Sequence, residues 1–248
     1  NASGHEAEAL TVLRQNALRH PADRMSLAAL AQRCAEAGLG EEQEAALTQL
    51  YQLPAPPHLR LECLRHLAMV RQSHGRLREL RDALVKQQTE NPGDAYGWLE
   101  LAVVQARAGE DAESRRCVYE ASKLRPKDVL LLGETARREA GFGFITEALG
   151  TLDEADKVAR SASTEMLRCL ILLGSDQQAR ALATLATLKL PADADLGLVL
   201  ATADALAQST AWSEAVRLLD QALTHHATNY QLHYLRAVAL EEKGDREA

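Results

Sequence analysis

Aromatic and β-branched residues are scarce in this chain of 248 residues. Phe, Trp and Tyr together make up 4% of the sequence, and Val, Ile and Thr are too scattered to alternate with polar residues as they do in a β-strand. Ala, Leu, Glu, Gln and Arg dominate, and these are strong helix formers. The composition therefore argues against a β-sheet fold and predicts an all-α protein with an interior of mostly Ala and Leu.

Long apolar runs and an excess of basic charge are also missing. The most apolar stretch, residues 166–173, contains Arg168 and is far shorter than the roughly 20 residues that a membrane span needs. The formal net charge is −7, which argues against nucleic-acid or anionic-lipid binding, because both need a basic face. No secretory signal is visible. We expect a cytoplasmic protein, or a periplasmic one if a signal has been removed.

Catalytic and metal-binding motifs are absent from the sequence. There is no Gly-x-Ser-x-Gly, no His-Glu-x-x-His, no Walker loop and no Gly-x-Gly-x-x-Gly after a strand. His225 and His226, followed by His233, come nearest to a metal motif, but no acidic or Cys partner lies at ligand spacing, and a histidine pair is favourable at a helix C-terminus. We expect no enzymatic activity, no cofactor and no bound metal.

The four cysteines are widely separated and form no Cys-x-x-Cys pair. They are Cys34, Cys63, Cys117 and Cys169. This spacing predicts free thiols that pack as small apolar side chains, and it favours a reducing compartment.

Two kinds of helix-breaking signal alternate along the chain. The pattern Pro-x-Asp occurs at residues 21–23, 92–94, 126–128 and 191–193. Proline cannot continue a helix, and Asp two residues later can cap the next one. Gly109 lies midway between two of these patterns, and Gly75 and Gly143 lie 34 residues before and after it. Glycine at these places suits a left-handed turn after a helix. Gly38, Gly174 and Gly244 extend this ladder, and Thr210 stands where a turn glycine is expected. The predicted unit is helix, Gly turn, helix, Pro-Asp turn.

Small residues form a third pattern. On the first helix of each unit they are Ala31, Ala68, Ala102, Ala136, Ala203 and Ala237. On the second helix they come in pairs: Ala148 with Ala155, Ala179 with Ala186, and Ala215 with Ala222. The members of a pair are seven residues apart, so they lie on one helical face. Small residues there predict closely packed antiparallel helices.

These patterns resemble the tetratricopeptide repeat (TPR) family, whose unit is a helix-turn-helix of 34 residues. The best match runs from Asp94 to Pro126, and residues 212–223 are similar to a family second helix. The matching residues are Trp98, Leu101, Ala102, Gly109, Ala121 and Pro126. The resemblance implies an α-α superhelix, a TPR-like solenoid of antiparallel helix pairs, with about six full repeats and partial terminal helices.

The repeats are expected to start near residues 24, 61, 95, 129, 160, 196 and 230. Some units depart from the pattern. The unit from 24 carries about three extra residues near 54–57. The unit from 160 is about three residues short, with Leu167 where a small residue is expected. Ser114 and Leu80 replace the second-helix alanine.

We expect residues 3–248 to form a single solenoid domain. Asn1-Ala2 looks like a cloning or cleavage scar, and the chain has no starting Met, so it is expected to be a piece of a longer protein. Residues 6–19 are typical of a second helix without its partner, and residues 230–243 of a first helix with an uncovered apolar flank. Terminal repeats normally carry a polar outer face, so we expect further repeats or another copy of the chain at the ends.

In TPR proteins the first helices line a concave surface on which partners dock. The resemblance thus implies a non-enzymatic scaffold that binds a partner protein or peptide. The candidate partner-binding residues are Arg65, Met69, Tyr96, Leu99, Val103, Arg137, Thr164, Arg168, Leu200, Asp204, Tyr234 and Val238. The Lys and Asn clamp of the chaperone-tail-binding subclass is absent, because Leu99, Val103, Thr164 and Leu200 stand at its positions. Two alternatives stay open: the TPR segment of a larger enzyme or envelope or secretion machine, and a structural module that self-assembles as a homo-oligomer through its terminal helices.

A charge pattern adds one hypothesis. Glu100, Glu134 and Glu165 recur at one repeat position, and Arg137 and Arg168 follow the last two by three residues. The favoured interpretation is intra-helix Glu–Arg pairs. The alternative is a mixed-charge stripe that binds a polar peptide, and it predicts that reversing both arginines to Glu weakens binding without lowering helicity.

Two aromatic residues lie close together on the helix expected near residue 95. Trp98 is expected in the core. Tyr96 is expected either to contact a partner or to cover the neighbouring repeat. Because the two residues are two positions apart, they point to different faces of the helix.

Overall fold

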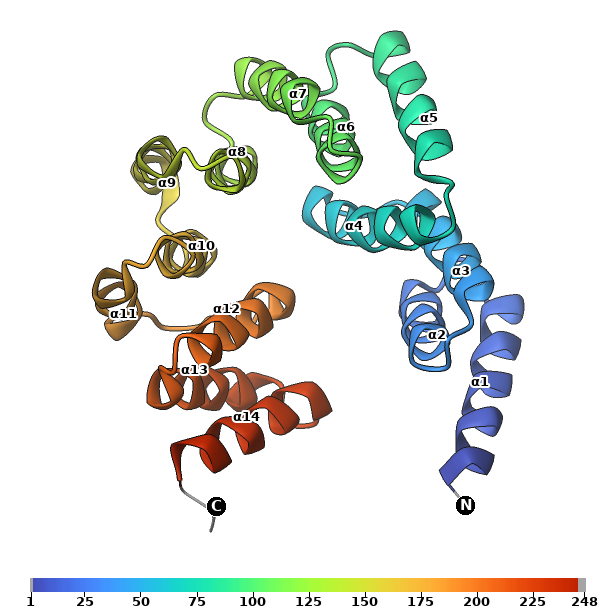
Figure 1. Cartoon of the computed structure of the whole chain (residues 1–248). Helices are drawn as coiled ribbons and strands as arrows, with labels where there is room; N and C mark the ends of the chain where they lie inside the picture. The colour runs from blue at the N-terminus through green and yellow to red at the C-terminus, as the bar shows by residue number, and fades with distance from the viewer. Residues whose placement is uncertain (1, 245–248) are drawn as a thin grey trace. The chain divides into compact units, whose positions relative to one another are not determined.

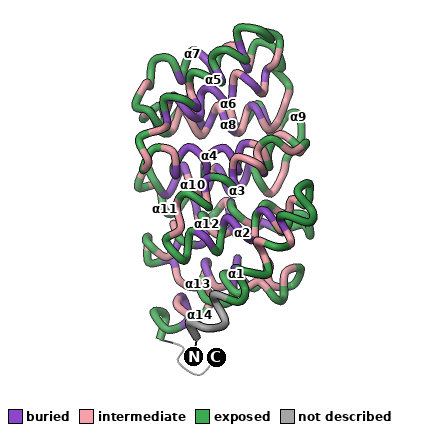
Figure 2. The backbone as a smooth tube through the Cα atoms, turned by 90° about the vertical axis from the view of Figure 1, so that its right-hand side faces the viewer, coloured by how far each residue is buried: buried purple, intermediate pink, exposed green. Residues whose placement is uncertain are grey.

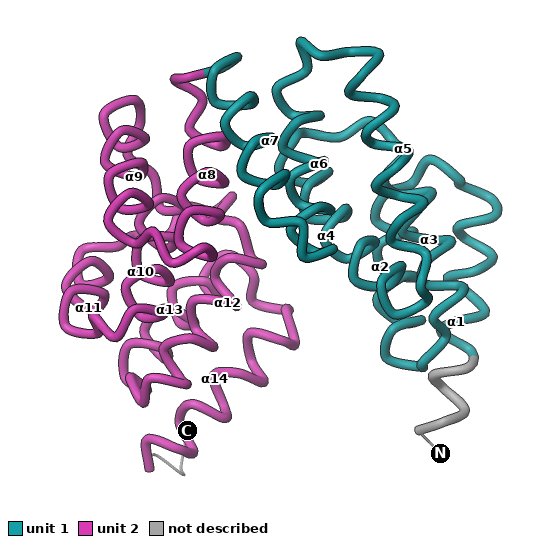
Figure 3. The backbone as a smooth tube through the Cα atoms, turned by 45° about the horizontal axis from the view of Figure 1, so that its top comes forward, with its two compact units in different colours: residues 1–125 teal, residues 126–248 magenta. Residues whose placement is uncertain are grey.

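The computed structural model describes the backbone of residues 2–244 and the side chains of residues 8–244 (Figure 1). Within that range every regular element is an α-helix, and there are 14 of them. The predicted all-α helical-repeat fold is therefore confirmed. The helices fall into two compact units, residues 1–125 and 126–248 (Figure 3), which we describe separately.

Unit 1 contains seven helices. They are α1 (Ala2–Arg19), α2 (Arg24–Glu36), α3 (Gly40–Gln52), α4 (Pro57–Ser73), α5 (Leu77–Glu90), α6 (Ala95–Arg107) and α7 (Asp111–Leu124). From α1 to α7 every helix packs against the next one along the chain, and α4 also contacts α6. Helix α4 begins earlier than the repeat pattern predicts because Pro56 and Pro57 start it, and proline is favoured in the first helical turn.

Unit 2 contains the other seven helices. They are α8 (Val129–Gly141), α9 (Ile145–Ala159), α10 (Ala162–Leu173), α11 (Gln178–Ala186), α12 (Leu196–Gln208), α13 (Trp212–His225) and α14 (Tyr230–Lys243). The pairs are α8 with α9, α10 with α11 and α12 with α13. The first helices α8, α10, α12 and α14 also contact one another in succession. These first helices form a row, and α9 and α11 lie along one side of it, on the left in Figure 1.

Helix N-termini are capped by the acidic residues of the Pro-x-Asp signals, with one exception. The side chains of Asp23, Asp94 and Asp128 accept backbone N–H bonds at the starts of α2, α6 and α8. In α12 the capping residue is Asp195, so the expectation for Asp193 is wrong. Capping by Asp satisfies amides that have no partner inside the helix.

The turn inside each pair contains a left-handed residue two positions before the second helix. Gly38, Gly75, Gly109 and Gly143 take this place with φ from 69° to 83°. In the last two pairs the residues are Asp176 and Thr210, with φ of 58° and 59°. The substitution of glycine by Thr210 is therefore confirmed. Gly174 has a φ of −66°, so its predicted role as the turn residue is wrong, and the turn is displaced by two residues to Asp176.

Thr210 offers a test of backbone strain. A β-branched residue in the left-handed region is strained by about 1–2 kcal/mol, whereas glycine adopts it freely. We expect Thr210→Gly to raise the free energy of unfolding by about 0.5–1 kcal/mol, after the entropy that glycine loses on folding. Urea unfolding monitored by circular dichroism measures it. The matched variant is Gly109→Thr, at a place where a Cβ meets no atom within 4 Å. This variant should have a lower free energy of unfolding than the wild type. If both variants changed the free energy of unfolding in the same direction, the left-handed strain at Thr210 would be contradicted.

The two-residue displacement at Asp176 changes the register of α10 and α11. The fourth residue of the second helices α5, α7, α9, α11 and α13 is buried and usually small. These residues are Leu80, Ser114, Ala148, Ala181 and Ala215. Ala179 and Ala186, which the sequence pattern places on the buried face of α11, are exposed. The small residue of a first helix in unit 2 is its eighth residue, and in α10 that residue is Cys169, which is fully buried. The sequence pattern places this position at Leu167, two residues too early. The distance from the start of α10 to that of α12 is 34 residues, so this unit is not short.

The other small repeat positions are buried. Ala31, Ala68, Ala102, Ala121, Ala136, Ala148, Ala155, Ala203, Ala215 and Ala222 are at most 4% exposed. Ala237 is exposed, contrary to the pattern. Figure 2 shows buried and exposed stretches alternating along the helices, as expected for helices that pack on one side. No helix in the described range is both long and apolar enough for a membrane span.

The four cysteines are free and buried, as predicted. Burial raises the pKa of Cys63 and Cys117 to about 11 and that of Cys169 to about 12. Burial also raises the pKa of Cys34. Since the thiolate is the reactive form, these side chains act as packing groups.

Candidate binding surface

The row of first helices in unit 2 places equivalent residues side by side. The fifth and ninth residues of each helix are Gly133 and Arg137 in α8, Met166 and Leu170 in α10, Leu200 and Asp204 in α12, and Tyr234 and Val238 in α14. We call these eight residues the first-helix face of unit 2. Tyr234 is 67% exposed and Met166 is fully buried. Asp204 is exposed, and Arg137, Leu170, Leu200 and Val238 are half-buried. The face thus combines apolar, acidic, basic and aromatic groups.

A cavity of about 220 Å³ opens on this face where α8 meets α10. It is lined by Arg137, Ala140, Ile145, Leu167, Leu170, Ile171 and Gly174. Arg137 is the one charged residue in this lining, and the rest are apolar or glycine. Such a site suits an apolar group beside an anion.

Arg137 has weak partners in the folded chain. The Nε atom is buried and makes no hydrogen bond within the described residues. The carboxylate of Glu134, one turn earlier, has Oε1 3.7 Å from that Nε, which is beyond hydrogen-bonding distance. A buried N–H without an acceptor is unfavourable. The Arg137 side chain is nevertheless 37% exposed, so the terminal N–H groups of its guanidinium are able to bind an additional anion.

Thr164 and Arg168 face α9 instead of the first-helix face. The Thr164 hydroxyl donates to Asp156 Oδ1 at 2.7 Å and Thr164 is buried. Arg168 lies 2.9 Å from Asp153 and 2.8 Å from Asp156. The predicted place of these two residues on the binding face is wrong, because the predicted register lies two residues too early. Reversal of Arg168 to Glu would place three acidic groups together, so this variant is expected to affect folding as well as binding.

The three recurring glutamates have three different partners. Glu134 pairs with Arg137 within α8 at 3.7 Å, as predicted. Glu165 instead pairs with Arg160, at the end of α9, at 2.6 Å, so the predicted Glu165–Arg168 pair is wrong. Glu100 pairs with Tyr51 of α3 and Arg60 of α4. All three carboxylates are buried, so they do not form an exposed stripe.

Glu100 joins three helices of unit 1. It accepts a hydrogen bond from the Tyr51 hydroxyl at 2.5 Å and from Arg60 Nε at 2.8 Å. The Arg60 guanidinium also lies 4.8 Å from the centre of the Tyr51 ring, a cation–π distance. Burial, followed by the nearby carboxylate of Glu100, raises the pKa of Tyr51 above its usual value. The cluster links α3, α4 and α6.

The other residues of unit 1 that were predicted to bind a partner include two buried and two accessible side chains. Leu99 and Val103 are 0% and 4% exposed, so they pack inside the unit and offer no surface; the prediction that they bind a partner is wrong for this reason. Arg65 is half-buried and Met69 is 45% exposed. Their role as partner contacts stays a prediction.

The two aromatics of α6 are both half-buried. Arg125 lies over the ring of Tyr96 at 5.1 Å, so Tyr96 is in contact with the end of α7. The Trp98 indole donates to the carbonyl of Pro92 at 2.9 Å. Trp98 therefore secures the turn before α6 and is not a fully buried core residue as predicted.

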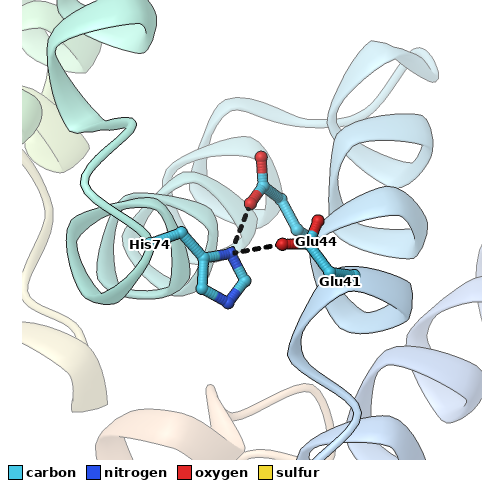
Figure 4. A group of neighbouring side chains, drawn as sticks. All are labelled: Glu41, Glu44 and His74. Atoms are coloured by element: carbon cyan, nitrogen blue, oxygen red, sulfur yellow. Dashed lines mark hydrogen bonds and ion pairs between the residues drawn. The ribbon is translucent and has the colours of Figure 1, made fainter.

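One group of side chains could offer metal ligands. Glu41, Glu44 and His74 bring one ligand atom each to within 4.8 Å of one another (Figure 4). Arg76 already occupies this position, since its guanidinium lies 2.7 Å from Glu41, 2.6 Å from Glu44 and 2.8 Å from His74 Nδ1. Arg71 also binds Glu44, at 3.1 Å. A metal ion would have to displace Arg76, and the arrangement is that of an ion-pair network between α3 and the turn after α4.

The histidines singled out from the sequence do not form such a group within the described residues. His233 Nε2 lies 2.7 Å from the carbonyl of Ala227. His225 is the last residue of α13, where a histidine is favourable.

Sequence reasoning missed the two best-defined polar clusters. Glu100 and Tyr51 are 49 residues apart, and Glu44 and His74 are 30 apart. Both clusters connect successive repeats, so no short motif contains them. Buried glutamates at one repeat position were a partial signal for the first cluster.

Comparison with known proteins finds matches among solved structures but none by sequence. No family model and no curated protein matches the sequence. A solved TPR protein, TTC0263 from Thermus thermophilus, matches with a TM-score of 0.51 at 19% identity, covering 73% of this chain and 99% of its own. A TPR protein from Parabacteroides merdae gives 0.48 at 15% identity, covering 90% and 88% of the two chains. A Pseudomonas aeruginosa structure described as pilF gives 0.47 at 17%, covering 77% and 87%.

Proposed function

Because the chain has the fold of the tetratricopeptide-repeat proteins, we propose that it is a non-enzymatic scaffold that binds a protein or peptide partner on the first-helix face of unit 2. The observation that carries this proposal is that aromatic, acidic and apolar side chains are accessible together on helices that pack against one another. Tyr234 and Asp204 project from α14 and α12. Leu200 and Val238, half-buried beside them, add apolar surface.

The composition of this face suits protein recognition. Tyrosine is enriched at interfaces because it offers a large apolar ring and a hydrogen-bonding hydroxyl at small entropic cost. The helices that carry the face pack on a continuous buried cluster that includes Val199, Ala203, Leu206 and Leu232. A surface held in this way loses little conformational entropy on binding.

The experiment is a selection of peptides from a displayed random library against the folded chain. The affinity of the selected peptides is then measured by fluorescence anisotropy for the wild type and for Asp204→Lys/Tyr234→Ala. Both residues are exposed, so the variant is expected to fold. We expect at least tenfold weaker binding, because loss of a central aromatic contact typically costs about 2 kcal/mol or more.

A matched control lies on the second-helix side of the same unit. Glu154→Lys/Val158→Ala makes the same kinds of change on α9, where Val158 is 46% exposed and Glu154 is exposed. The control should bind the selected peptides like the wild type. Equal affinity of the Asp204 and Tyr234 variant, or loss only in the α9 control, would exclude the first-helix face as the binding site.

A further inference from the structure

We propose that the cavity between α8 and α10 binds an aliphatic side chain of the partner, and that Arg137 binds a carboxylate of the residue next to it. The inference rests on the proposed function and specifies the partner chemistry: a peptide segment with Leu followed by Asp or Glu. It follows from the size of the cavity, the chemistry of its walls and the state of Arg137.

The cavity has the size and lining for one aliphatic side chain. Its volume of about 220 Å³ exceeds the roughly 150 Å³ that accommodates benzene in an apolar protein cavity. Ile145, Leu167, Leu170 and Ile171 supply the walls, and Gly174 leaves one side without a side chain. Burial of a leucine side chain removes apolar surface from water on both partners.

Arg137 determines the charge of the occupant. Other arginines of unit 2 already bind carboxylates closely: Arg168 to Asp156 at 2.8 Å, Arg160 to Glu165 at 2.6 Å and Arg236 to Asp220 at 2.5 Å. Arg137 has only the distant carboxylate of Glu134 at 3.7 Å, and its buried Nε has no acceptor within the described residues. Because the side chain is 37% exposed, an incoming carboxylate can bind the two terminal N–H groups of the guanidinium in the paired geometry that arginine favours.

The sequence provides reporters at this site. The chain contains two isoleucines, Ile145 and Ile171, and both line the cavity. Selective labelling of the isoleucine δ1 methyl groups therefore gives a two-signal NMR spectrum in which both signals report on the cavity. The probes are acetylated and amidated Gly/Ser decapeptides with a central Leu-Asp, Leu-Asn or Ala-Asp.

We expect the Leu-Asp peptide to shift both isoleucine signals saturably. The Leu-Asn peptide should bind about tenfold more weakly, since it lacks the charge-assisted bond. The Ala-Asp peptide should also bind about tenfold more weakly, because it leaves the cavity unfilled. Arg137→Gln should abolish the difference between Asp and Asn peptides, and Arg137→Lys should retain part of it. Ala140→Leu, which fills the cavity from α8, should prevent the shifts.

Several outcomes overturn the assignment. They are unmoved isoleucine signals at millimolar Leu-Asp peptide, equal affinity for Asp and Asn peptides, and discrimination that persists in Arg137→Gln. Binding by Ala140→Leu equal to that of the wild type also overturns it. The proposed function is judged separately: library peptides that need Asp204 and Tyr234 but leave both isoleucine signals in place would retain the first-helix face and exclude the cavity.

Discussion

Replacement of Arg60 by Met is expected to lower the free energy of unfolding by about 3 kcal/mol. The Glu100 side chain is only 4% exposed, and the variant leaves its charge buried with the Tyr51 hydroxyl as a donor but without the two arginine N–H donors. Breaking a buried ion pair from one side costs about 3–5 kcal/mol, and the lower end applies because the Arg60 side chain is 31% exposed. Urea unfolding at neutral pH gives the value.

Two further variants separate the buried pair from a surface pair. Arg116→Met removes an arginine that is 65% exposed and 3.6 Å from Glu113, and it should change stability by less than about 1 kcal/mol. The triple variant Tyr51→Phe/Arg60→Met/Glu100→Leu removes both charges and the hydroxyl that binds them, and it should regain most of the loss, because apolar replacement of a whole buried pair is often neutral. A single Arg60 variant within about 1 kcal/mol of the wild type, the range of a surface pair, would show that Glu100 does not depend on it.

The fold was predictable from the sequence because a few neighbouring residues determine where the helices of each repeat begin and end. Proline stops a helix, Asp caps the next, and glycine permits the left-handed turn, so these signals need no tertiary information. Asp94 and Gly109 act as expected. The same local logic predicted that Thr210 takes the place of a turn glycine.

The register failed where a local signal was ambiguous. Gly174 looks like a turn glycine, but the left-handed residue is Asp176, and Asp is one of the few other residues that tolerate this conformation. The error of two residues passed to every position counted from it. It placed Thr164 and Arg168 on the candidate face in place of Met166 and Leu170, and it placed Ala179 in the core in place of Ala181.

The candidate site was predictable only in part, since its members come from different repeats. Arg137 and Asp204 were identified by repeat position alone. The cavity depends on Ile145 and Gly174 as well, and neither stands at a position where repeat proteins are expected to bind. Which arginine lacks a close acceptor depends on side-chain packing across helices, which no spacing rule contains.

Leu152→Ala is expected to lower the free energy of unfolding by about 2–5 kcal/mol, because it removes a large side chain from a site where the neighbours cannot close the space. Leu152 is fully buried in the cluster that includes Ala136, Ala148 and Met166. The matched control is Val158→Ala on the same helix, where the side chain is 46% exposed and the expected loss is below about 1 kcal/mol. Similar losses in both variants would contradict the packing of α9.

The same variant tests the prediction that residues 3–248 form a single solenoid. Repeat arrays unfold together only where the interface between neighbouring repeats is strong enough. Hydrogen exchange measured on peptide fragments reports the opening of each unit separately. If one solenoid unfolds cooperatively, Leu152→Ala in unit 2 and Arg60→Met in unit 1 each accelerate exchange along the whole chain. If Leu152→Ala accelerates exchange only within residues 126–248, and Arg60→Met only within residues 1–125, the chain consists of two folding units and the single-solenoid prediction is wrong.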